Sequence, residues 1–194
     1  MKKFLASAVV IFGLTGMGLY GQTNTSANTV KGYVITLKGD TVRGDIKINP
    51  KKEAEPYVKV SVKNEKGEAK SFKAEKAKLY VAENITYVAK KFNDETFFFK
   101  VISTGAITLY ELHYEEFSVA NANEAVVKTD YFMEKSDGGE LVKIKSGKFR
   151  KQVSDVMQDN EVIVQDINEK KYTYDNLQEL FEEYNKQAKV TSKG

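Results

Sequence analysis

Alternation of apolar and polar residues is clearest in residues 32–48, GYVITLKGDTVRGDIKI, where it predicts a β-hairpin. In the second strand every other residue is apolar or small, which places Val42, Gly44, Ile46 and Ile48 on one face. Gly39 lies between the two strands and supplies the positive φ that a short hairpin loop needs. We expect the rest of the sheet to be built beside this pair.

Further strands are predicted by the same alternation, or by short apolar runs between turn residues, as far as Gly147. They are residues 57–62, 69–73, 79–82, 85–92, 96–102, 106–115, 131–135 and 141–144. Both prolines of the chain fall in a polar loop, residues 49–56, which separates the first hairpin from the second. Phe97, Phe98 and Phe99 are consecutive and so put rings on both faces of their strand, which predicts that both faces are covered.

After Gly147 the apolar spacing changes to three and four residues, which predicts two helices. The first carries Phe149, Val153, Val156 and Met157 on one face, and the second carries Leu177, Leu180, Phe181 and Tyr184. Asp175 and Gln178 have the spacing of an N-cap and its partner. Residues 162–164 and Ile167, between the helices, are predicted to form a short strand or an extended connection. The expected fold is α+β and mostly β: an antiparallel sheet curled into a sandwich or open barrel, with two C-terminal helices.

The N-terminal residues 1–21 have the pattern of an export signal. Lys2 and Lys3 precede an apolar stretch that is interrupted by glycines and is shorter than the ~20 residues that span a bilayer. An uncleaved membrane anchor is the less favoured alternative. Residues 22–30 are predicted to be a flexible leader, 31–187 a single β-rich domain that includes the helices, and 188–194 a disordered tail. No cysteine follows the apolar stretch, which excludes lipoprotein-type acylation.

The charges are nearly balanced, with 30 Lys and Arg against 27 Asp and Glu. No basic stripe with interleaved aromatic residues stands out, so a nucleic-acid partner is not expected. The lysine-rich hairpin of residues 59–73 has two readings, contact with anionic lipid or polysaccharide and a simple solvated strand face. The solvated face is the more common arrangement.

Catalytic and metal-binding motifs are sparse. His113 is the only histidine and there is no cysteine, which excludes a cysteine nucleophile and any zinc or haem site built on several such ligands. Glu111, Glu115 and Glu116 surround His113 and could form a carboxylate pair for glycoside hydrolysis, but charges on strands more often serve solubility. The Asp166 segment opens like a calcium loop and fails at later positions, and no phosphate-binding loop occurs. We predict no catalytic residue, no metal and no cofactor.

Aromatic residues provide the candidate site. Phe97, Phe99, Tyr110 and Tyr114 are the candidates to line a ligand cavity or an interaction surface, although packing in the core is the more common role of such residues. The two alternatives differ in whether the rings converge on a void.

Several stretches of the chain resemble a family of exported Bacteroidetes proteins. The first is GYVITLKGDTVRGDIKI, residues 32–48, with its Gly-Tyr strand and Gly-Asp-Thr turn. The others are Tyr131-Phe132-Met133-Glu134-Lys135, Asp137-Gly138, Phe149, and the closing Tyr172, Leu177 and Tyr184-Asn185. In some members the module is followed by an outer-membrane β-barrel, so this chain is expected to be the module alone. The resemblance brings no catalytic motif.

The export signal, the missing catalytic motifs and the resemblance together predict a non-enzymatic envelope protein. We expect it in the periplasm or at the outer-membrane periphery of a Gram-negative bacterium, with secretion as the alternative, and acting as an accessory module that binds another envelope protein. A carrier of a small ligand or glycan, with an aromatic-lined cavity, is the alternative. An enzyme comes third and requires His113 in a cleft beside a carboxylate. The oligomeric state is left open.

Overall fold

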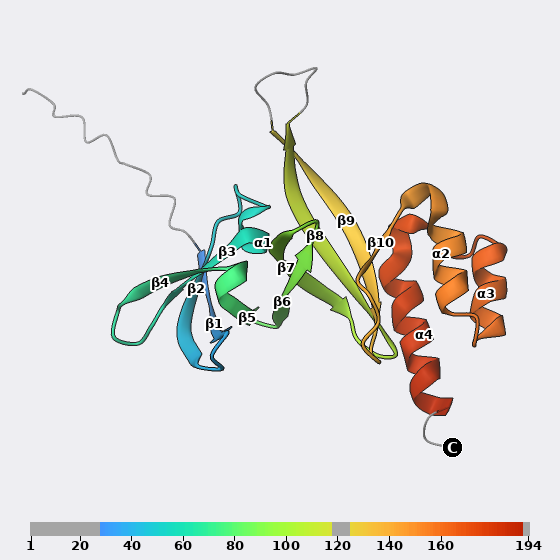
Figure 1. Ribbon diagram of the computed structural model, residues 1–194, viewed down its shortest axis with the longest axis horizontal. Helices are drawn as coiled ribbons and strands as arrows, with labels where there is room; N and C mark the ends of the chain where they lie inside the picture. Colours follow the sequence, from blue (N-terminus) through green and yellow to red (C-terminus); the bar gives the residue numbers. More distant parts are fainter. Residues whose placement is uncertain (1–27, 118–124, 192–194) are drawn as a thin grey trace, which may run out of the picture.

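The computed structural model describes residues 28–117 and 125–191, and in these residues it shows one ten-stranded antiparallel sheet that is not closed into a barrel (Figure 1). The strands are β1 (Asn28–Thr36), β2 (Thr41–Ile48), β3 (Lys59–Lys63), β4 (Ala69–Lys73), β5 (Ala77–Ala82), β6 (Ile85–Phe92), β7 (Glu95–Ser103), β8 (Ile107–Phe117), β9 (Ala125–Lys135) and β10 (Val142–Ile144). Their spatial order is β10-β9-β8-β7-β6-β5-β1-β2-β3-β4. The predicted fold class is confirmed.

The helices of the described residues are α1 (Glu55–Val58), α2 (Phe149–Val156), α3 (Glu161–Asn168) and α4 (Leu177–Thr191). Short 3-10 turns occur at Ala74–Lys76, Ser146–Lys148 and Tyr174–Asn176. Figure 1 shows α2, α3 and α4 grouped at the β10 end of the sheet and α1 beside the central strands. Among the described residues, no helix has the length and apolar character needed to cross a membrane.

The predicted hairpin is β1 and β2, and it lies inside the sheet between β5 and β3. Gly39 has a φ of +96°, as its place in the turn requires. Gly32 and Gly44 are directly paired, and a Cβ on either would collide with the backbone carbonyl of the strand on its other side. The two glycines therefore allow the neighbouring strands to approach the hairpin closely.

Three hydrophobic clusters hold the fold together. The first joins α2, α3 and α4 to β8, β9 and β10, and the second lies on one face of the strands from β1 to β7. The third contains Tyr57 of α1 and the aromatic residues of β7 to β9. Phe98 belongs to the second cluster and Phe99 to the third, and both are 0 % exposed. This confirms that the strand is covered on both faces.

The structure corrects the prediction for residues 162–167, which form the helix α3 and not a strand or an extended connection. Asn160 starts this helix by accepting a hydrogen bond from the backbone N–H of Ile163 at 3.1 Å. Ile163 and Ile167, four residues apart, are both fully buried. The apolar run was too short to distinguish a strand from a helix by its spacing.

Other element boundaries also differ from the prediction. β9 begins at Ala125, well before the predicted start of that strand at residue 131. Residues 57 and 58, expected in a strand, end the helix α1, whose first turn contains Pro56. The N-cap before the last helix is Thr173 and not Asp175. The backbone N–H of Thr173 donates to the side-chain oxygen of Asn176 at 2.6 Å, and the Thr173 hydroxyl donates to the same oxygen at 3.2 Å. Asn176 thus has the role that the sequence pattern assigned to Gln178.

Both limits of the predicted domain, residues 31 and 187, fall inside elements of secondary structure. β1 begins at Asn28, within the predicted leader, and α4 continues to Thr191, within the predicted tail. The predicted export signal, residues 1–21, lies outside the described residues.

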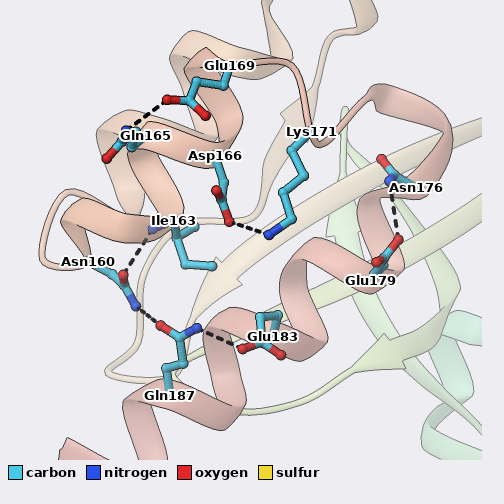
Figure 2. A network of polar contacts seen from close by, with 10 residues as sticks. All are labelled: Asn160, Ile163, Gln165, Asp166, Glu169, Lys171, Asn176, Glu179, Glu183 and Gln187. Atoms are coloured by element: carbon cyan, nitrogen blue, oxygen red, sulfur yellow. Dashed lines mark hydrogen bonds and ion pairs between the residues drawn. The ribbon is translucent and has the colours of Figure 1, made fainter.

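Polar contacts join α3 to α4 (Figure 2). Asn160 donates to the side-chain oxygen of Gln187 at 2.6 Å, and Gln187 donates to Glu183 at 2.7 Å. Lys171, in the connection between the helices, pairs with Asp166 of α3 at 2.7 Å. The bond between Asn160 and Gln187 thus ties the start of α3 to α4.

Candidate functional site

A groove of about 930 Å³ opens between α1, with the loop before it, and strands β6 to β10. Its apolar lining consists of Ala54, Val58, Phe92, Phe97, Leu112 and Tyr114, and its polar lining of Lys52, Glu55, Lys59, Asn93, Glu95, Glu115, Asp130 and Lys143. The groove is partly open to solvent and is not an enclosed cavity. A volume of this size is at the upper end of the range for ligand pockets, about 300–1,000 Å³.

The four predicted site residues are divided between this groove and the core. Phe97 and Tyr114 line the groove. Phe99 and Tyr110 lie in the third hydrophobic cluster, where the ring of Phe99 contacts that of Phe132 edge-on at 5.0 Å. The predicted rings therefore do not converge on one void: two form the wall of a groove, and two pack beneath it.

Ion pairs shape the rim of the groove. Lys143 of β10 pairs with Asp130 of β9, and Lys59 pairs with Glu55 at 3.1 Å. Burial, followed by a hydrogen bond to Asp130, raises the pKa of Tyr114. The rim thus presents both signs of charge around an aromatic wall. Asp130 and Lys143 are not predicted as site residues by any pattern in the sequence, because they join the groove only through strand pairing.

Tyr110 is held by a second polar cluster. Its hydroxyl donates to Glu134 at 2.9 Å, and Lys90 donates to the same carboxylate oxygen at 2.6 Å. The Lys90 ammonium also lies 5.0 Å from the centre of the Tyr110 ring. Burial and the bond to Glu134 raise the pKa of Tyr110 well above its usual value. The hydroxyl therefore stays protonated into strong alkali and remains a donor to Glu134.

The acid–base cluster around Glu111 is the arrangement most similar to an active site. One oxygen of Glu111 accepts the Tyr57 hydroxyl at 2.7 Å and the Lys100 ammonium at 3.1 Å, and it lies 3.2 Å from Nε2 of His113. The His113 ring stacks on Tyr57 with 4.7 Å between the centres. Burial and the bond to Glu111 raise the pKa of Tyr57 well above its usual value.

This cluster connects α1 to β7 and β8. Glu111 and His113 do not line the groove, although the carboxylate is within hydrogen-bond reach of the imidazole. An enzyme is predicted to require His113 in a cleft and a carboxylate beside it. The carboxylate is present, as Glu111, but His113 does not line the groove. Within the described residues, no three His, Cys, Asp or Glu side chains are grouped so that they could hold a metal ion.

Comparison with known proteins gives no match to a family model, a curated protein or a solved structure. The resemblance to the exported Bacteroidetes family therefore stays a prediction.

Proposed function

We propose that the chain is a non-enzymatic binding module of the bacterial cell envelope, and that its groove receives a segment of another envelope protein. The observation that carries the proposal is the groove itself, which is open to solvent and lined by both aromatic and charged side chains. An open groove suits a segment that enters from the side and remains attached to a larger molecule. The export pattern and the family resemblance support the cellular location.

The lining of the groove supports binding in preference to catalysis. Phe92, Phe97 and Tyr114 offer apolar contact area, and the charged rim offers partners of either sign for a polar backbone. The histidine and its carboxylate neighbour lie outside this lining and are engaged with Tyr57 and Lys100.

The alternative is a carrier of a small ligand or glycan. The observation that favours it is the position of Tyr114 and Phe97 in the same groove as Asp130 and Glu115. Aromatic faces pack against the C–H groups of a sugar while carboxylates accept hydrogen bonds from its hydroxyls. The groove would then hold a free molecule and not part of a protein.

Site-specific photocrosslinking of the full chain in its native cells tests the proposal. A photoreactive phenylalanine analogue replaces Val58, which lines the groove and is 47 % exposed. The control position is Val162 on α3, which is 64 % exposed. We expect one defined protein adduct at position 58, recovered with the outer-membrane fraction, and none at position 162.

Equal adducts at both positions, or none at position 58, would overturn the partner proposal. Glycan binding that is lost in Tyr114→Ala, without a protein adduct, would establish the alternative. A hydrolase activity of the purified chain that Glu111→Gln abolishes would overturn the non-enzymatic part.

A further inference from the structure

Five apolar side chains lie on the face of β1, β5 and β6 that is turned away from the second hydrophobic cluster. They are Tyr33 and Ile35 of β1, Leu79 and Val81 of β5, and Val88 of β6, named here the outer apolar strip. At β6 this face adjoins the third cluster, because Val88 is paired with Phe99. Strand pairing places Tyr33 opposite Val81, Ile35 opposite Leu79, and Leu79 opposite Val88, so all five share one face. All five remain partly exposed.

Basic side chains continue this face beyond the strip. Lys31 of β1, Arg43 and Lys47 of β2, and Lys63 of β3 are all exposed and lie on the same face by strand pairing. The Arg43 guanidinium lies 5.2 Å from the centre of the Tyr33 ring, so the basic group contacts the apolar strip directly. Asp45 is the one carboxylate that the described β1, β2 and β3 place on this face, and it pairs with Lys31 at 2.6 Å.

The excess of positive charge is concentrated in the N-terminal strands, β1 to β5. Residues 28–82 contain 13 Lys and Arg against 7 Asp and Glu, whereas the rest of the chain has 17 against 20. The near-neutral total of 30 against 27 therefore hides an asymmetry. A net positive end next to an acidic remainder orients the molecule towards a negatively charged surface.

We propose that the outer apolar strip and its basic border dock on a membrane surface that contains anionic phospholipids. The basic side chains would contact lipid phosphates, and Tyr33, Ile35 and Leu79 would enter the boundary between headgroups and acyl chains. A polysaccharide or nucleic acid would match the charges but leave the apolar strip uncovered. A membrane interface matches both features of the face. The inference does not depend on the groove, whose ligand could be entirely different.

Vesicle flotation with the full chain tests the inference. Vesicles of phosphatidylcholine mixed with phosphatidylglycerol are compared with vesicles of phosphatidylcholine alone, at low and high salt. We expect flotation with the anionic vesicles only, and a strong reduction at high salt. The double variant Arg43→Glu, Lys47→Glu should weaken binding by about tenfold or more, since each basic group near the surface contributes on the order of fivefold.

The matched control is Lys148→Glu, Lys151→Glu, which makes the same change of charge at exposed positions of the helical end. It should leave binding within about twofold of the parent chain, because these residues lie outside the strip and its basic border. Leu79→Ser changes no charge and should weaken binding several-fold with the salt dependence preserved. The urea midpoint of each variant shows that the fold is retained.

Absence of flotation with anionic vesicles would overturn the inference, as would equal losses in the two charge variants. Binding to neutral vesicles that none of the variants changes would also exclude this face. These outcomes are independent of the crosslink at position 58, so failure here is distinguishable from failure of the groove proposal.

Discussion

At the scale of single residues, Asn185 is a buried polar side chain that links α4 to the sheet. It is 3 % exposed, and its amide accepts the backbone N–H of Ile107 at 3.0 Å and donates to the carbonyl of Ile107 at 2.8 Å and to Ser103 at 3.1 Å. Gly105 leaves space for it, since a Cβ there would collide with the Asn185 side chain. One buried amide thus joins α4 to the connection between β7 and β8.

Asn185→Ala should lower the free energy of unfolding by about 2–3 kcal/mol, because it leaves buried backbone groups of Ile107 without partners. Urea denaturation measures the change. The control is Asn168→Ala at the exposed end of α3, which should change stability by less than about 0.5 kcal/mol. An unchanged midpoint in Asn185→Ala would show that water replaces the amide and that the contact is not stabilising.

At the scale of elements, the start of α4 shows how a local sequence signal can be misplaced. Asp175 precedes the apolar stripe by the distance expected of an N-cap, but the chain first makes the 3-10 turn Tyr174–Asn176. Thr173 is therefore the N-cap of this turn, and its backbone N–H donates to the side-chain oxygen of Asn176. Thr173 and Asp175 are both residue types that favour the N-cap position. The additional 3-10 turn places Thr173 and not Asp175 there.

Thr173→Ala should cost about 1 kcal/mol, the usual effect of removing a capping hydroxyl. Asp175→Ala should cost only a few tenths of a kcal/mol, through its favourable charge in the first turn. Thermal and urea unfolding of the two variants compares them directly. The opposite ranking would show that α4 in solution begins where the sequence pattern placed it.

At the scale of the whole molecule, three clusters share one continuous sheet, and buried tyrosines contribute to all of them. Burial raises the pKa of Tyr87 to about 12, and burial with a bond to Asp159 raises that of Tyr184 to about 12. The pKa values of Tyr57, Tyr80 and Tyr110 are raised further, in each case chiefly by burial.

These shifts predict a loss of stability in strong alkali. Because the pKa is higher in the folded than in the unfolded chain, the stabilisation is complete below the unfolded value of about 10 and is lost as pH rises through the folded values. The urea midpoint should therefore fall between pH 10 and 12, together with the tyrosinate absorbance change. Tyr184→Phe, which cannot ionise, should make this fall shallower. A midpoint that is constant to pH 12 would contradict the expectation.

The sequence by itself determined most of the strands, their turns, and α2 and α4, the first and last of the three C-terminal helices. These depend on spacing and on residues such as Gly39, whose conformation is a local matter. It also showed that Phe98 and Phe99 must be covered on opposite faces, since adjacent residues of a strand point apart. Export, envelope location and the family resemblance are predictions from the same sequence that the fold does not test.

Only the tertiary structure decided the order of the strands, the helix α3 and the composition of the groove. Phe97 and Tyr114 were candidates from sequence, but Val58, Asp130 and Lys143 join them from distant parts of the chain only when the sheet pairs and curls. Such pairings depend on burial summed over the whole molecule, and local alternation carries no information about which strand becomes whose neighbour.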